Sequence, residues 1–255
     1  MRIGSIVAAG LLAAAAARGQ TADELIAKNI AARGGYEKLK AVRTMRLIGT
    51  MKAGGESLPA ALELKRPNKS RWEFLVDGQT GIQAFDGKEG WTWLPFEGQT
   101  GPQPMGDEER AEAEQQADLD GPLVDFQQKS EKIELLGHDS KYRPDDWKLK
   151  VTLKDGDVRY VYLDSKTFLQ SATVSRRKID GVEVEVRSEV GDYRKVGDLV
   201  LPHSFTASSP GGGPSQSIQF DRIDVNVPID DSKFAMPEPK KPAGPPGMEP
   251  TPTVG

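Results

Sequence analysis

Two histidines are the first candidates for chemistry. His138 stands beside Asp139 and Ser140, which together supply the residue types of a Ser/His/Asp triad. Triad members come from separate elements of a fold, so three adjacent residues predict a polar turn with a solvated histidine. His203 follows Pro202 at the end of an apolar segment, where we expect a packed or half-exposed ring. No G-x-S-x-G sequence is present. The chain is therefore predicted not to be an enzyme and to have no catalytic residue.

Metal and cofactor sites lack their usual ligands. The chain has 2 His and no Cys, which excludes thiol catalysis, Cys-ligated zinc and a multi-His metal centre. The triplet Gly211–Gly213 lies between prolines with no Lys-Ser/Thr after it, so it predicts a flexible loop. Glu183 and Glu185 alternate with valines, as on the solvent face of a strand. One acidic cluster matches no EF-hand spacing and indicates a solvated helix face: Asp107, Glu108, Glu109, Glu112 and Glu114. We expect no cofactor and no metal.

Apolar side chains are the more informative group. Three of the 4 Trp lie within one segment of about 25 residues, interleaved with Phe and preceded by Met. Trp offers a large contact area and Met adapts its shape, so both suit a surface that holds apolar ligands. The same residues could equally fill a core, and both interpretations stay open here. The candidate ligand-binding residues are Met45, Leu47, Met51, Trp72, Phe74, Phe85, Trp91 and Trp93.

These residues lie on segments with the period of two that is typical of strands. The alternation begins at Val42 and returns repeatedly as far as Val225. Asp-Gly pairs separate several of the segments, as at Asp77-Gly78 and Asp86-Gly87, and predict hairpins. About eleven or twelve short strands follow from this spacing, which indicates a large antiparallel sheet or barrel. The expected fold class is mainly β with a few helices.

Helices are expected at two places. Thr21 and Glu24 have capping-box spacing, and an apolar stripe follows: Leu25, Ile26, Ile30 and Ala31. Gly34-Gly35 predicts the end of this helix, with one or two further turns over 36–41. A second helix is predicted over 107–120, which is rich in helix formers and ends at Gly121-Pro122. A further short helix is possible over 122–128.

The two ends of the chain differ from the rest. Residues 1–19 have a positive start, an apolar run and small residues near Gly19, which predicts a cleaved signal peptide and a periplasmic protein. Residues 237–255 are Pro-rich and predict a disordered tail. Residues 20–236 are expected to form one domain. No later stretch is long enough to span a membrane, and a net charge of −4 does not suit a nucleic-acid partner.

Four motifs in order resemble the periplasmic lipoprotein-carrier family, the outer-membrane lipoprotein-sorting proteins and their LolA-like relatives. They are ADELIAKNIAARGGYEKLKAVRTMRLIGTM, AFDGKEGWTWLP, YLDSKTFLQ with YRKVGDLVLPHSF, and VNVPIDDSKFAMP. The resemblance implies a strongly curved, half-open antiparallel barrel with helices as a lid over its concave side. It also implies a hydrophobic cavity that holds acyl chains in transit across the periplasm.

Two functions follow as hypotheses. The first is a soluble periplasmic carrier or binder of a lipid or lipoprotein acyl chain, with the eight apolar candidates lining the cavity. The second is an envelope-stress sensor or protein-interaction module on the same fold, with an envelope or inner-membrane protein as partner. On the first hypothesis, replacing Trp91 and Trp93 by Ala is expected to abolish ligand uptake and to leave the fold intact.

Overall fold

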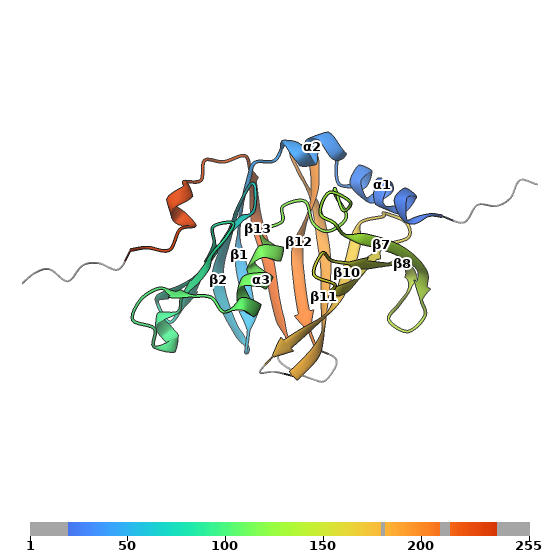
Figure 1. The fold of residues 1–255 in the computed structure, drawn as a ribbon. Coiled ribbons are helices and arrows are strands. Elements are labelled where there is room, and N and C mark those ends of the chain that lie inside the picture. Colours follow the sequence, from blue (N-terminus) through green and yellow to red (C-terminus); the bar gives the residue numbers. More distant parts are fainter. Residues whose placement is uncertain (1–19, 180–181, 210–214, 239–255) are drawn as a thin grey trace, which may run out of the picture.

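The computed structural model of the chain describes residues 20–179, 182–209 and 215–238. The expected signal peptide (1–19), the Gly211–Gly213 loop and nearly all of the Pro-rich tail therefore lie outside the described residues. Among the described residues, no helix is long and apolar enough to cross a membrane. Those residues form one antiparallel sheet with short helices packed against it (Figure 1).

The sheet has 13 strands in the order β6-β5-β4-β3-β2-β1-β13-β12-β11-β10-β9-β8-β7. Two meanders are joined where β1 pairs with β13, and the sheet bends into two wings without closing into a barrel (Figure 1). This confirms the expected curved, half-open architecture. The strands are β1 Thr44–Ala53, β2 Glu56–Lys65, β3 Lys69–Val76, β4 Gln79–Phe85, β5 Gly90–Trp93, β6 Gln103–Pro104, β7 Lys132–Asp139, β8 Arg143–Thr152, β9 Val158–Leu163, β10 Gln170–Ile179, β11 Val182–Val196, β12 Leu199–Ser208 and β13 Gln216–Val225. The strand beyond the expected twelve is β6, whose two residues are too short to show alternation.

Helix α1 (Ala22–Ala32) begins with the predicted capping box. The amide of Glu24 donates to Thr21 Oγ1, and the amide of Thr21 donates to Glu24 Oε2. The buried stripe differs from the prediction, because Ala31 is exposed and Asn29 is buried instead. Asn29 Nδ2 donates to the carbonyl of Phe168 at 2.8 Å, which satisfies its amide away from water.

The chain leaves α1 through two glycines with positive φ, Gly34 at 120° and Gly35 at 97°, as the sequence predicted. Helix α2 (Tyr36–Ala41) follows. Two short 3₁₀ helices, η1 (Pro95–Glu97) and η2 (Asp231–Lys233), complete the helical elements of the described residues.

Helix α3 (Asp107–Gln116) ends four residues earlier than predicted, and the expected helix over 122–128 is a series of turns. The reason is local competition for backbone groups. The Asp118 carboxylate accepts from the amide of Asp120, and Lys129 Nζ donates to Asp118 and to the carbonyl of Gly121. These bonds hold residues 117–130 as a folded loop, and α3 lies in the bend between the wings (Figure 1).

Asp120 anchors this loop to one end of the sheet. Its carboxylate is nearly fully buried and accepts two hydrogen bonds from Arg66, at 2.6 and 2.8 Å, and one from Lys40 at 2.9 Å. Arg66 also donates to the carbonyls of Leu39 and Val42, so one side chain joins β2, α2 and the loop. Burial opposes ionisation of Asp120, but the bonds from Arg66 and Lys40 outweigh it and lower its pKa from 3.8 to about 2.

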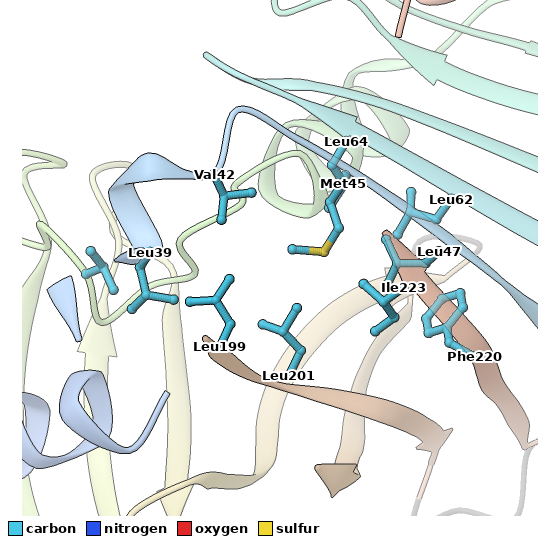
Figure 2. Packing of buried hydrophobic residues seen from close by; sticks show 11 residues of the cluster. Leu39, Val42, Met45, Leu47, Leu62, Leu64, Leu199, Leu201, Phe220 and Ile223 are labelled. Carbon is cyan, nitrogen blue, oxygen red and sulfur yellow. The ribbon is translucent and has the colours of Figure 1, made fainter. Parts of the chain in front are cut away.

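The main core lies next to this anchor on the concave face of the sheet, since its member Leu39 accepts from Arg66. Figure 2 shows how its side chains pack. Side chains from α2 and its C-cap, the loop and four strands pack together there. They are Leu39, Val42, Met45, Leu47, Leu62, Leu64, Val124, Leu199, Leu201, Phe220 and Ile223. A second core packs α1 against β8 and β9 through Leu25, Ile26, Leu123, Leu149, Val151, Val161 and Leu163. This end of the concave face is therefore filled by the protein's own side chains.

The convex face carries a different structure, which we call the C-terminal clasp, residues 227–238. It runs along the outside of the β1–β5 wing (Figure 1). Phe234 is fully buried there, Trp91 Nε1 donates to its carbonyl at 2.8 Å, and Arg71 donates to the carbonyl of Lys233. Lys233 also pairs with the buried carboxylate of Glu63. The clasp thus covers an apolar part of the outer face.

Replacing Asp120 by Asn should lower the free energy of unfolding by about 3 kcal/mol, because it leaves the partly buried Arg66 without its carboxylate and Lys40 with Asp125 alone. The folded pKa of Asp120 is depressed, so its stabilisation is complete above about pH 4 and is lost as the pH falls through about 2. Urea unfolding between pH 7 and pH 2 measures both effects. A variant as stable as the wild type at pH 7 would contradict this role.

Replacing Trp91 by Ala should cost about 3–5 kcal/mol of unfolding free energy, since its side chain is only 2% exposed and holds Phe234. Trp93 is 36% exposed, so its replacement by Ala serves as the matched control with a change within about 1 kcal/mol. Denaturant unfolding followed by circular dichroism compares the two. Equal stability of both variants would show that the clasp does not depend on Trp91.

Candidate functional site

An apolar band crosses the concave face beyond the filled core. Strand pairing places five side chains in one cross-strand row: Val190 of β11, Phe205 of β12, Ile218 of β13, Met51 of β1 and Leu58 of β2. Directly paired residues of antiparallel strands point to the same face. All five are half-buried, whereas the core at the anchored end of the same face is fully buried. We call this row the apolar band.

Aromatic rings lie beside the band. Trp72 stacks on Phe220 with ring centroids 6.1 Å apart, and Phe205 meets Phe220 edge-on at 6.0 Å. Strands β1 and β2 separate the strand of Phe220 from the strand of Trp72. In line with Phe220 these two strands carry the small residues Gly49 and Ala60. A Cβ at Gly49 would lie 1.9 Å from the carbonyl oxygen of Gln219, so this close strand approach requires glycine. Small residues therefore leave room for the rings to meet.

Helix α3 lies over this part of the concave face with few apolar contacts. Ala113 and Ala117 pack on Phe85, and Ala113 is the one buried residue of the helix. Two polar contacts join it to the sheet side: Trp72 Nε1 donates to Gln116 Oε1 at 3.0 Å, and Lys154 pairs with Glu114 at 2.8 Å. The acidic cluster predicted as a solvated helix face belongs to this helix. A polar helix cannot fill an apolar surface, which leaves the band only half covered.

A cleft of about 760 Å³ lies between α3 and strands β8–β11. Its lining mixes acidic and basic side chains with few apolar ones. The charged lining residues are Glu108, Glu112, Lys150, Asp157, Arg159, Arg176, Glu183 and Glu185. Such a lining is unfavourable for a hydrocarbon, because charged groups would lose water without gaining partners. The apolar band is the better candidate surface for an apolar ligand.

The structure divides the eight sequence candidates into three groups. Met51 lies in the apolar band, and Trp72 and Phe74 are half-buried beside it. The second group is enclosed by the protein itself, with Met45 and Leu47 in the main core and Phe85 beneath α3. Only the first group reaches the open part of the concave face.

Trp91 and Trp93 form the third group, and for these two the expectation that all eight candidates line one cavity does not hold. Phe85 pairs with Gly90, so Trp91 points to the opposite face, together with Ala84. Trp91 packs under the clasp, and Trp93 is exposed on the same convex side. The expectation that replacing both would leave the fold intact therefore does not suit Trp91.

Sequence reasoning missed four members of the band: Leu58, Val190, Phe205 and Ile218. Leu58, Phe205 and Ile218 lie in segments whose period of two predicts a strand. The missing signal was cross-strand register, since only the pairing of β11, β12, β13, β1 and β2 brings these positions into one row.

The two histidines lie apart from the band. His138 is exposed at the end of β7, stacks on Trp147 with centroids 4.1 Å apart, and its Nδ1 lies 3.0 Å from the Asp146 carbonyl oxygen. His203 is buried, with Nδ1 3.1 Å from the Leu201 carbonyl oxygen. In the described ranges, no group of three or more His, Asp or Glu is arranged to hold a metal ion.

No protein-family model matches the chain, and no curated protein matches it. Solved structures do match. A LolA superfamily protein from Nitrosomonas europaea gives a TM-score of 0.56 at 13% identity, over 85% of this chain and 98% of its own. An outer membrane lipoprotein-sorting protein domain from Vibrio parahaemolyticus gives 0.56 at 11% identity, over 83% and 94%. A DUF1329 family protein from Desulfovibrio piger gives 0.51 at 12% identity, over 85% and 98%.

These likenesses cover nearly the whole of each matched chain, while their sequence identities are too low to carry function across. What they establish is the fold, and it is the one that the sequence motifs implied: this chain has the LolA-like fold.

Proposed function

We propose that this protein binds a lipid, or the acyl chain of a lipoprotein, on the apolar band and carries it through the periplasm without catalysis. The observation that carries the proposal is the half-buried row of five apolar side chains on a face that no second sheet of the described residues covers. Water is displaced from such a surface when a hydrocarbon lies on it, so binding needs no reactive group.

Two further observations support the periplasmic carrier. The first 19 residues have the composition of an export signal. One matched structure is described as an outer membrane lipoprotein-sorting protein domain, and the proposal extends that role to this chain by fold.

The size of the band fits one long hydrocarbon chain. It crosses five neighbouring strands, and four spacings of about 4.8 Å make about 19 Å. A C–C bond of about 1.5 Å advances a zigzag chain by about 1.3 Å, so about 15 methylenes span the band. Their burial contributes at most about 12 kcal/mol at about 0.8 kcal/mol each. Association costs at least about 4 kcal/mol, so Kd is expected to be micromolar or weaker.

Replacing Met51 by Glu should reduce uptake of a fluorescent fatty acid at least about tenfold, because it puts a carboxylate between Ile218 and Leu58 within the band. Ile48 lies three residues earlier on β1, on the convex side, and is 42% exposed. Its replacement by Glu is the matched control and should leave uptake unchanged. Thermal unfolding of both variants verifies that each is folded.

Equal uptake by both variants would contradict the site. Purified wild-type protein should also release lipid into an organic extract, as measured by mass spectrometry. Protein that is free of lipid and does not bind the fluorescent fatty acid would overturn the carrier function itself, leaving the protein-interaction hypothesis for this fold.

Affinity should depend on chain length in a defined way. Each added methylene up to about 16 carbons should strengthen binding by up to roughly fourfold, because burying it contributes about 0.8 kcal/mol of binding free energy. Beyond that length the chain leaves the band and the gain should stop. Competition of saturated fatty acids from 10 to 20 carbons against the fluorescent probe measures this. A flat series would show that the hydrocarbon does not lie on the band.

A further inference from the structure

Helix α3 presents different faces to the two wings of the sheet. Ala113 and Ala117 pack on Phe85 of the β1–β5 wing, and Gln116 accepts from Trp72 of the same wing. Another face of the helix lines the cleft of about 760 Å³ on the side of β8–β11. The residues of that face follow the spacing of one helical stripe, and they are Glu108, Ala111, Glu112 and Gln115. The cleft therefore has one wall made by α3 and another made by the sheet.

The sheet wall presents hydroxyl groups and an arginine on the concave face. Arg159 of β9 pairs with Ser175 of β10, and both line the cleft. Thr173, two residues before Ser175, pairs with Ser188 of β11 and with Val161 of the second core, which places all of them on the concave side. The arginine and the three hydroxyl residues are half-buried. A guanidinium with neighbouring hydroxyls is suited to donate to phosphate oxygens.

The sheet wall continues into the apolar band. Ser188 lies two residues from Val190, the member of the band on β11, and both face the concave side. Ser175 pairs with Val186, four residues from Val190, so about 14 Å separate Ser175 from the band at about 3.4 Å per residue. That gap needs about eleven bonds at about 1.3 Å each, which a glycerol ester and the first carbons of its acyl chain supply. One lipid can therefore place its hydrocarbon on the band and its head group in the cleft.

The two walls of the cleft carry charges of opposite sign. Glu108 and Glu112 belong to the α3 wall, Arg159 belongs to the sheet wall, and Asp157 of the turn between β8 and β9 adds a third carboxylate. Arg159 and Glu112 already take part in interactions within the chain, so a head group must replace what each of them gives up. An anionic head pairs with the arginine but meets the carboxylates as like charges, and an uncharged head gives neither wall an ionic partner. A head with a phosphate and an ammonium pairs with both walls.

The other charged residues of the cleft lie on the convex side and have ion-pair partners of their own. These partners are Glu134 for Lys150, Glu183 for Arg176 and Arg187 for Glu185. Recognition of a head group on the concave side therefore rests on the α3 face and on the sheet wall described above.

We propose that the ligand is a lipid with a zwitterionic head, whose phosphate is held by Arg159 and the hydroxyls of β10 and β11 and whose ammonium faces Glu108 and Glu112. The inference rests on the proposed function, because the hydrocarbon of this lipid lies on the apolar band. It adds what the band cannot supply, which is a choice among lipids that carry the same acyl chain.

Competition against the fluorescent fatty acid tests the head group at constant chain length. The competitors are lysophosphatidylethanolamine, lysophosphatidylglycerol and monoacylglycerol with the same acyl chain. We expect lysophosphatidylethanolamine to displace the probe at a concentration at least about fivefold lower than either of the others, since it alone pairs with both walls. Equal potency of the three lipids would overturn the inference and leave the proposed function intact. Displacement by none of them would contradict the proposed function itself.

Glycerophosphoethanolamine, which has the same head and no acyl chain, separates a lipid ligand from a soluble one. It should not displace the probe at the concentrations used for the lipids, because the acyl chain supplies most of the affinity. Displacement by this compound at those concentrations would show that the cleft holds a soluble zwitterion, and would overturn the assignment to a lipid.

Variants of the cleft identify the residues that read the head group. Arg159→Gln should cancel most of the advantage of lysophosphatidylethanolamine, and Ser175→Ala should reduce it about twofold. Affinity for monoacylglycerol should stay within about twofold in both, since its head group does not depend on these donors. Arg222→Gln is the matched control, because Arg222 is 69% exposed on the convex side and pairs with Asp224.

Glu112→Gln provides a readout of opposite sign. Removing this carboxylate should strengthen binding of lysophosphatidylglycerol and weaken that of lysophosphatidylethanolamine, because the cleft loses a negative charge. Thermal unfolding verifies that each variant is folded, and Ser175→Ala changes too little volume to disturb the sheet. An unchanged ranking of the three lipids in all the cleft variants would overturn the inference.

Discussion

In the part of the chain that the structure describes, a single bent sheet has a concave face that no second sheet covers, and the other features of the structure follow from that constraint. Apolar residues alternate inward along both wings, so the hollow must be filled by other segments of the chain or by something else. Helices α1 and α2 and the loop anchored by Asp120 fill one end with a close-packed core. Over the other end lies α3, whose polar sequence gives it one buried residue. The half-covered apolar band is the result.

The convex face needs a different solution, because some of its strand residues are also apolar. The clasp supplies it by placing Phe234 against Trp91 and a cation against the buried carboxylate of Glu63. Burial opposes ionisation of Glu63, but Lys233 and Arg46 outweigh it and hold its pKa below the ordinary value. The two faces thus differ: the clasp covers part of the outer face on the β1–β5 wing, and the inner face keeps a half-buried apolar surface.

Alternation and turn chemistry predicted twelve of the thirteen strands, the capping box at Thr21 and the glycine end of α1. They did not show which residues of neighbouring strands lie on the same face of the sheet. A hairpin with an even number of loop residues pairs odd with even positions, so the four residues between Phe85 and Gly90 turn Trp91 to the far side. Counting the residues of that loop would have placed Trp91 and Trp93 on the opposite face of the sheet from Trp72 and Phe74. The early end of α3 could not be predicted from local sequence patterns, because Asp118 contacts Lys129 only in the folded loop.

The fold is shared with proteins from several bacteria at very low identity, so the function must be argued from the concave face itself. The most direct measurement is NMR of methyl groups in the presence of a fatty acid that carries a nitroxide spin label. Methyl signals of Met51, Leu58 and Ile218 should broaden, while those of Ile48 and Leu75 on the convex face should stay sharp. Broadening confined to the convex face, or none at saturating fatty acid, would contradict the account.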